Sequence, residues 1–268
     1  MSRPSVFNAG RPFESKVGSD KPPGPDALAE RVGDELHQLA RPTRLIPRAR
    51  QRDSAVMTSA SRGPNTKLTP ADEAAFISAV GRLGVTDPRS VAEGLALLHV
   101  RELRRGEYLL RAGELAVYAG VLVTGLLREH FVTSRGVDRT KGFVTELQFT
   151  GSLADLLRGE PARASIVADA PARLVVLVYA QLRALQAKSS AWATAGQHSA
   201  ELLLRYKAER EYEFLCLTAE ERYAAFSARH PHLEARVSGL HIASFLGITP
   251  VHLSRLRARR ARARRASA

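Results

Sequence analysis

The segment between residues 239 and 257 constrains the fold of this 268-residue chain more than any other part of the sequence. Two helices that cross at a steep angle need a small residue where they touch, and Ala243 supplies it. The turn between them needs a residue that tolerates positive φ, which Gly247 does, while Thr249 can cap the second helix and Pro250 suits its first turn. The segment therefore predicts a helix-turn-helix, whose buried apolar residues would be Ile242, Leu246, Ile248, Leu253 and Leu256.

The residues left over on the second helix predict a contact with DNA. A helix-turn-helix lays its second helix in the major groove, where polar side chains meet base edges or phosphates. Arg255 suits a bidentate contact to guanine, worth roughly 1 to 3 kcal/mol of discrimination, and a phosphate contact that only positions the helix is the alternative. For His252 the alternative is a merely solvated side chain. The predicted DNA-binding residues are Thr249, Val251, His252, Ser254, Arg255, Arg257 and Arg259.

The charge of the chain points to a polyanionic partner. A formal charge of +13 and a pI near 10.6 fit nucleic acid, acidic lipid and acidic protein equally well. No acidic residue follows Glu234, and the chain ends in an Arg-rich tail. Such a run is usually a solvated tail, but one that extends a recognition helix lies beside phosphates, which predicts salt-dependent DNA binding.

The first 67 residues differ in composition from the rest. They are rich in Pro, Gly, Ser and Arg and show no sustained periodicity, which predicts a disordered basic tail over residues 1–67. This tail either adds nonspecific attraction to DNA or is simply a solvated extension. Met57, the only internal methionine, is an alternative start of translation.

Residues 68–180 predict a β-rich sensory domain preceded by helices. Apolar residues recur at helical spacing over 71–98, with a break at Thr86-Asp87-Pro88, which predicts two short helices. Short β-prone runs then follow, separated by glycine-containing turns, and this spacing is typical of a barrel, sandwich or jelly roll. The predicted strands cover residues 108–110, 117–123, 126–133, 143–147, 165–168 and 174–178.

The strand signals stop after Tyr179. Residues 181–216 predict a long helix with an apolar stripe that is not a strict heptad. Thr218 and Glu221 have the spacing of a capping box and open the predicted helix-turn-helix domain, residues 217–268. The fold class is therefore α+β, with N-terminal helices, an antiparallel β-roll, a long helix and a C-terminal helical domain. Only an Arg/Ala tail follows the recognition helix, so a wing, if present, would lie before the motif.

Two classes of protein are disfavoured by the sequence. No run approaches the roughly 18 to 20 apolar residues of a membrane span, and the N-terminus lacks a signal-peptide core, so a cytoplasmic protein is predicted. Cys216 is the only cysteine, which is too few for a disulfide framework or a Cys-ligated cluster within one chain.

Five short motifs stand out within the predicted domains: Arg105-Gly106-Glu107, Phe149-Thr150-Gly151, Arg163-Ala164-Ser165, Glu220-Glu221-Arg222-Tyr223 and Leu246-Gly247-Ile248-Thr249-Pro250-Val251-His252-Leu253-Ser254-Arg255. With these motifs, the order of elements over roughly residues 71–260 resembles the Crp/Fnr family of bacterial transcription regulators. The resemblance implies a homodimer formed through the long helix near residues 192–212, which reads a two-fold symmetric site on double-stranded DNA, and RNA polymerase as a further partner.

The effector pocket departs from that family's pattern. Members that bind cyclic nucleotide carry a Gly-Glu pair for the ribose hydroxyl and an adjacent Arg-Ser or Arg-Thr for the cyclic phosphate. Here Ser152 follows Gly151, and Ala164 follows Arg163, with the hydroxyl displaced to Ser165. An unpaired ribose hydroxyl weakens binding by at least a lost hydrogen bond. No cofactor is therefore predicted, and cyclic AMP is disfavoured as the ligand. The effector-pocket candidates remain Gly151, Ser152, Arg163 and Ser165.

Several alternatives stay open at this stage. Arg163 either binds another anion or pairs with a carboxylate such as Asp155 or Glu160. A cupin-type metal enzyme would need clustered ligands, yet only His99 and His130 lie in the roll region, so no enzyme is predicted. A sensory module that acts through protein contacts or nonspecific DNA binding is the second functional alternative.

Overall fold

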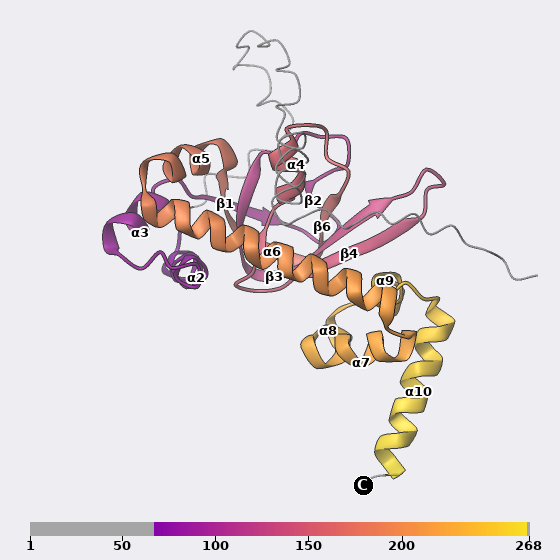
Figure 1. Ribbon diagram of the computed structural model, residues 1–268. Coiled ribbons are helices and arrows are strands. Elements are labelled where there is room, and N and C mark those ends of the chain that lie inside the picture. Colours follow the sequence, from indigo (N-terminus) through magenta and orange to yellow (C-terminus); the bar gives the residue numbers. More distant parts are fainter. Residues whose placement is uncertain (1–66, 267–268) are drawn as a thin grey trace, which may run out of the picture. The chain divides into compact units, whose positions relative to one another are not determined.

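The computed structural model describes residues 67–266, all of which belong to one compact unit (Figure 1). The predicted tail and the alternative start at Met57 lie outside these residues, apart from Lys67. The α+β class is confirmed, since helices flank an antiparallel sheet. The helices are α2 (Pro70–Gly81), α3 (Pro88–Leu95), α4 (Leu153–Arg158), α5 (Tyr179–Lys188), α6 (Ser190–Cys216), α7 (Ala219–Arg229), α8 (Leu233–Arg236), α9 (Gly239–Leu246) and α10 (Pro250–Ala266).

Two capped helices precede the sheet, as predicted. Thr69 and Asp72 form a capping box at the start of α2, and Asp87 caps α3 through the backbone N–H of Ser90. Each helix has proline in its first turn, where a missing N–H costs nothing. Phe76 of α2 stacks on Trp192 of α6, with 6.2 Å between ring centroids, so these helices share a core with the start of the long helix.

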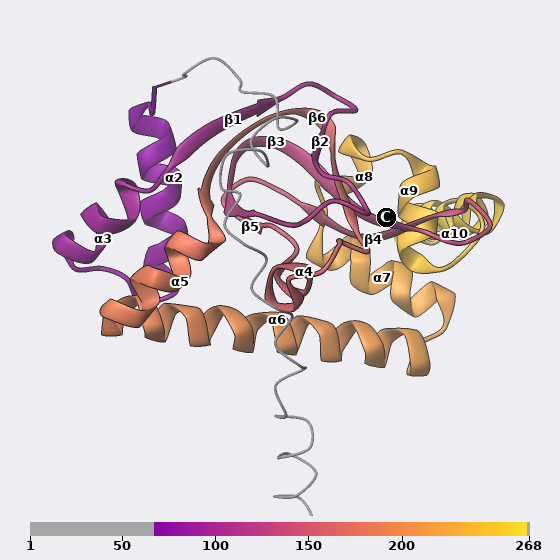
Figure 2. The same ribbon diagram turned by 90° about the horizontal axis from the view of Figure 1, so that it is seen from above.

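The sheet is built around two long strands that pair with each other. The path runs β1-β6-β3-β4, with β2 added to β6 and β5 added to β3, and every pairing is antiparallel. Figure 2 shows these strands curling into a roll. The strands are β1 (His99–Leu103), β2 (Tyr108–Leu110), β3 (Tyr118–Val132), β4 (Asp138–Val144), β5 (Phe149–Thr150) and β6 (Ser165–Val178).

The strands differ from the prediction in several ways. Predicted runs 117–123 and 126–133 are one bent strand, because Gly125 has a φ of 106° and lies so close to Pro171 O that a Cβ there would stand 2.3 Å from it. Runs 165–168 and 174–178 likewise join into β6. Strand β1, the two-residue strand β5 and the polar first half of β4 were not predicted, because their sequences lack apolar alternation. Strand β4 ends at Val144, whereas the predicted run extends to residue 147.

The predicted long helix is interrupted. Ser189 has extended backbone angles, φ −126° and ψ 121°, so residues 181–216 fall into α5 and α6. Two consecutive serines are weak helix formers, because their hydroxyls compete for backbone hydrogen bonds. Helix α6 then runs alongside the roll from α2 and α3 to α7 (Figures 1 and 2). The domain boundaries at 67, 180 and 216 stay a prediction.

Candidate nucleic-acid interface and effector site

Helices α9 and α10 form the helix-turn-helix geometry that the sequence predicts. Ser238 caps α9, and Gly247 ends it in the left-handed region with φ 69° and ψ 30°. Thr249 then caps α10, since its Oγ1 accepts the backbone N–H of His252 at 3.2 Å. Residues Ile242, Ala243, Leu246, Leu253 and Leu256 are buried at the helix contact, and Ile248 is half-buried.

The candidate base-reading face of α10 is open. Val251 is 62% exposed, and Thr249, Ser254 and Arg255 are exposed as well, while His252 is half-buried. Val251 and Arg255 lie four residues apart and therefore share a helix face. The Arg255 side chain makes no hydrogen bond or ion pair among the described residues, so its donors are available to an external acceptor.

The next arginines along α10 contact neighbouring helices. Arg259 pairs with Glu220 of α7 at 3.5 Å, and the Arg260 guanidinium lies 5.6 Å from the centre of the Tyr223 ring. Arg257 lies against Gly239 at the start of α9, where a Cβ would meet its Nη1 at 3.3 Å. The structure thus separates the predicted DNA-binding arginines into one free side chain, Arg255, and others that contact the helix-turn-helix domain itself.

Two arginines hold the end of α9 and were not predicted. Arg210 Nη2 of α6 donates to Phe245 O at 2.9 Å, and Arg222 Nε of α7 donates to Leu246 O at 3.1 Å. These bonds satisfy carbonyls at the C-terminus of the helix, where cations are also favoured. Phe214 lies under the turn, because a Cβ on Gly247 would meet its ring at 2.8 Å.

A buried carboxylate on α6 orients Arg210. Glu213 accepts a hydrogen bond from Arg210 at 2.8 Å and forms an ion pair with Arg229 of α7. Burial lowers the pKa of Arg210, and the neighbouring Tyr206 partly offsets that change. The sequence signal for an arginine in this role is its position four to seven residues from the end of a long helix, and such arginines are too common to be diagnostic.

The helix-turn-helix domain also contacts the roll. Arg236 of α8 donates from Nη1 to Glu146 Oε2 at 2.9 Å and from Nη2 to Gly125 O at 2.6 Å. The Arg236 hydrogen bonds lower the pKa of Glu146 to about 2, against the opposing effect of burial. Phe143 of β4 contacts Phe245 of α9, with 5.6 Å between ring centroids. Polar and apolar contacts together therefore join α8 and α9 to the sheet.

The effector-pocket candidates lie where β5, α4 and β6 meet. Gly151 has φ 122° and approaches Tyr118 O, which a Cβ would meet at 2.8 Å. Ser152 is buried and donates from Oγ to Asp155 Oδ2 at 2.6 Å. The other oxygen of Asp155 accepts the backbone N–H of Arg163 at 3.4 Å and lies 3.0 Å from Arg158 Nη2.

Asp155 acts as an internal anion at this junction. Burial alone would raise the pKa of Asp155, but hydrogen bonds from Ser152 and from the backbone N–H groups of Arg163 and Ala164, with the charge of Arg158, hold that pKa below its ordinary value. The side chain of Arg163 is exposed and pairs with neither Asp155 nor Glu160, since Arg158 contacts both.

Internal hydrogen bonds already engage several polar groups of this junction. The Ser152 hydroxyl donates to Asp155, and Asp155 also accepts the backbone N–H of Arg163. Ser165 Oγ already accepts the backbone N–H of Ala112 at 2.9 Å. Within residues 67–266, no three His, Cys, Asp or Glu side chains gather as a metal site would require.

Comparison with known proteins supports the fold. Residues 100–189 match the family model of the cyclic nucleotide-binding domain. The structure of FixK2 from Bradyrhizobium japonicum aligns with a TM-score of 0.51 at 20% identity, covering 60% of this chain and 83% of that one. A putative cAMP-binding regulatory protein from Silicibacter pomeroyi aligns with a TM-score of 0.51 at 22% identity, covering 71% and 88%. No curated protein matches the chain in sequence. None of the described helices has the length and apolar character needed to cross a membrane.

Proposed function

We propose that this chain, which has the β-roll fold of Crp/Fnr regulators, is a sequence-specific DNA-binding transcription regulator. The open face of α10 carries the proposal. Val251, Ser254 and Arg255 are exposed on a capped helix, and Arg255 has no acceptor among the described residues. A planar guanidinium with free donors suits the O6 and N7 acceptors of guanine in the major groove.

The second part of the proposal is a homodimer formed through α6. The buried face of α6 includes Trp192, which stacks with Phe76 of α2, and Glu213, which pairs with Arg229 of α7. On another face, Leu204 is 69% exposed and Leu215 is 77% exposed, the two highest values among large apolar side chains of this helix. Helical spacing adds small residues to the same face, namely Ala193, Ala200 and Ala208. A second copy would bury this stripe and place two α10 helices on one duplex.

The input signal of this regulator is proposed to be something other than cyclic AMP. The internal hydrogen bonds of Ser152, Asp155 and Ser165 support a roll that keeps this region folded without a nucleotide. The effector candidates Gly151, Ser152, Arg163 and Ser165, and a contact with RNA polymerase, stay predictions. If α10 made only protein contacts or nonspecific DNA contacts, the chain would be a sensory module of the alternative kind.

Selection of bound duplexes from a random library tests the proposal. The expected result is a two-fold symmetric consensus that the full chain binds about a thousandfold or more tighter than random DNA at fixed salt. Sedimentation of the free protein and of the complex measures the dimer, and Leu204→Arg is expected to give a monomer with weakened binding. Salt-dependent binding without any consensus would contradict a sequence-specific regulator.

A further inference from the structure

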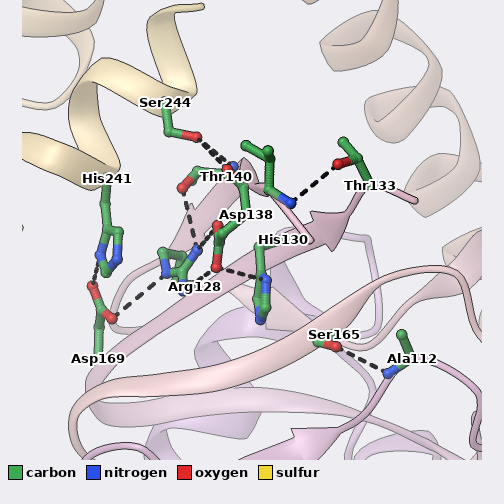
Figure 3. Close-up of polar contacts among 11 residues, drawn as sticks. Ala112, Arg128, His130, Thr133, Asp138, Thr140, Ser165, Asp169, His241 and Ser244 are labelled. Atoms are coloured by element: carbon green, nitrogen blue, oxygen red, sulfur yellow. Dashed lines mark hydrogen bonds and ion pairs between the residues drawn. The ribbon is translucent and has the colours of Figure 1, made fainter. Parts of the chain in front are cut away.

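Arg128 of β3 lies at the centre of a polar cluster between the roll and α9 (Figure 3). Its side chain is only 7% exposed. Nη1 and Nη2 donate to the two carboxylate oxygens of Asp138 on β4, at 2.7 and 3.0 Å. On the other side, Nε lies 3.7 Å from Asp169 Oδ1 on β6, which is an ion-pair distance without a hydrogen bond. One cation therefore serves carboxylates from both neighbouring strands.

Helix α9 joins this cluster at two points. His241 Nδ1 lies 3.1 Å from Asp169 Oδ2, and because an ionised carboxylate can only accept, Nδ1 carries the proton and donates. The backbone N–H of Thr140 on β4 donates to Ser244 Oγ at 2.9 Å. The first helix of the helix-turn-helix is thus tied to the two strands that flank β3.

The cluster also reaches toward the effector-pocket candidates. His130 of β3 has a side chain only 5% exposed, and its Nδ1 lies 3.0 Å from Asp138 Oδ2, although too poorly aligned for a hydrogen bond. Its cross-strand neighbour on β6 is Ser165. The polar groups therefore extend from the strand position of Ser165, through His130, Asp138 and Arg128, to α9.

Charge makes Asp169 the critical member at the α9 end. Its carboxylate is the partner of the His241 donor and the second anion beside Arg128, whose side chain is buried. If this carboxylate were lost, the His241 donor would lose its acceptor and the buried Arg128 guanidinium would lose its second anion, and such losses are costly in a partly buried cluster. Helix α10 packs on α9 through Leu253 and Leu256, so the position of α9 sets that of α10.

We propose that Asp169 is a positioning residue, which ties the helix-turn-helix to the roll and thereby fixes the direction in which α10 meets DNA. The inference deepens the proposed function and rests on it for the DNA part. The tie does not block the reading face, because Val251 and Arg255 are exposed while the contacts to Asp169 are made. Through this contact, a movement of the roll would also move α10.

Amide exchange of Thr140 in the full chain tests the tie without DNA. This N–H is directed at α9, so its exchange rate reports whether α9 stays in place. Asp169→Asn is expected to speed exchange about tenfold, because a neutral amide accepts from His241 more weakly than a carboxylate and leaves Arg128 without its second anion. Glu93→Gln, which removes a carboxylate from the exposed ion pair with Arg89, is the matched control and should change nothing. An unchanged Thr140 rate in Asp169→Asn would overturn the proposal.

A double-mutant cycle and a DNA measurement complete the experiment. His241→Gln should resemble Asp169→Asn, and the double variant should be little worse than either, because both weaken the same contact between α9 and β6. At fixed salt, Asp169→Asn should bind the selected duplex about tenfold more weakly with an unchanged salt slope, because phosphate contacts are retained. Faster Thr140 exchange with unchanged affinity would overturn the positioning role alone. If the unaltered chain had no sequence preference, the proposed function would fail, while Thr140 exchange would still decide the tie.

Discussion

The open face of α10 and the junction of α4 with β6 use their polar groups in opposite ways. Arg255 directs its donors to solvent, whereas Ser152, Asp155 and the backbone of Arg163 bond to one another. Free donors on a surface can serve an external acceptor, whereas the hydrogen bonds among Ser152, Asp155 and Arg163 form without a ligand. We therefore expect α10 to bind a partner and the junction to stay folded without one.

Replacement of Arg255 should have the largest effect. Arg255→Ala is expected to weaken binding to the selected duplex about thirtyfold, which corresponds to about 2 kcal/mol, while weak salt-sensitive binding to random DNA remains. Arg259→Ala is the matched variant, because its guanidinium already pairs with Glu220. Competition titrations with both duplexes measure the difference. Equal losses on selected and random DNA in Arg255→Ala would mean a phosphate contact.

The internal anion should contribute measurably to folding. Asp155→Asn removes a buried charge that accepts from Ser152 and from the backbone of Arg163, so the free energy of unfolding should fall by about 1 to 3 kcal/mol. Urea unfolding measures it, with Glu160→Gln as a control on an exposed carboxylate that also contacts Arg158. Equal stabilities of the two variants would show that Asp155 is not needed to complete the junction.

The buried side chain of His130 predicts that the free energy of unfolding depends on pH. Burial, followed by the charge of Arg128, lowers the pKa of His130 from 6.5. The unfolded chain therefore binds a proton first as pH falls, so the free energy of unfolding should decrease below about pH 6.5 until the lower folded-state pKa is reached. The slope from this group cannot exceed about 1.4 kcal/mol per pH unit.

The measurement is urea unfolding at a series of pH values, with His130→Gln as the comparison. The nearby charged groups Arg128, Asp138, Asp169 and His241 remain in that variant, so the difference between the two curves isolates the His130 contribution. Parallel curves for the two proteins would contradict a buried neutral imidazole.

The sequence predicted local geometry better than the partners of individual side chains. Gly247 and Thr249 announce the turn and the second cap because both roles depend on neighbours in the chain. The tie between Asp169 and His241 joins residues 72 positions apart, and nothing in either local sequence specifies it. The alternative that the Arg163 side chain pairs with Asp155 or Glu160 is not seen, because Arg158 lies one helical turn from Asp155 and contacts both carboxylates.

The difference between local geometry and long-range contacts also explains the outcome for strand β3 and for the arginines of α10. Strand β3 was predicted as two runs because a glycine often interrupts a strand. The close approach of Gly125 to Pro171 O shows that this glycine instead bends a continuous strand. Arg257 and Arg259 share with Arg255 a residue type and a helix, so their different surroundings follow from the packing of α7 and α9 against α10. The sequence therefore singles out Arg255, but the contacts of Arg257 and Arg259 with α9 and α7 depend on packing that the local sequence does not specify.

Addition of cyclic AMP should leave the Tm of the chain unchanged, which is the smallest of the predicted effects. A ligand that binds only the folded state raises stability by RT ln(1 + [L]/Kd), so a dissociation constant of about 10 μM would give about 2.7 kcal/mol at about 1 mM ligand. The junction of Ser152 and Asp155 predicts no shift in Tm at that concentration, because the phosphate would meet an ionised carboxylate that already holds the backbone donors. A clear upward shift in the unaltered chain, lost in Arg163→Ala, would mean that Asp155 moves aside for the nucleotide, and the contrast between the open helix face and the self-contained junction would then disappear.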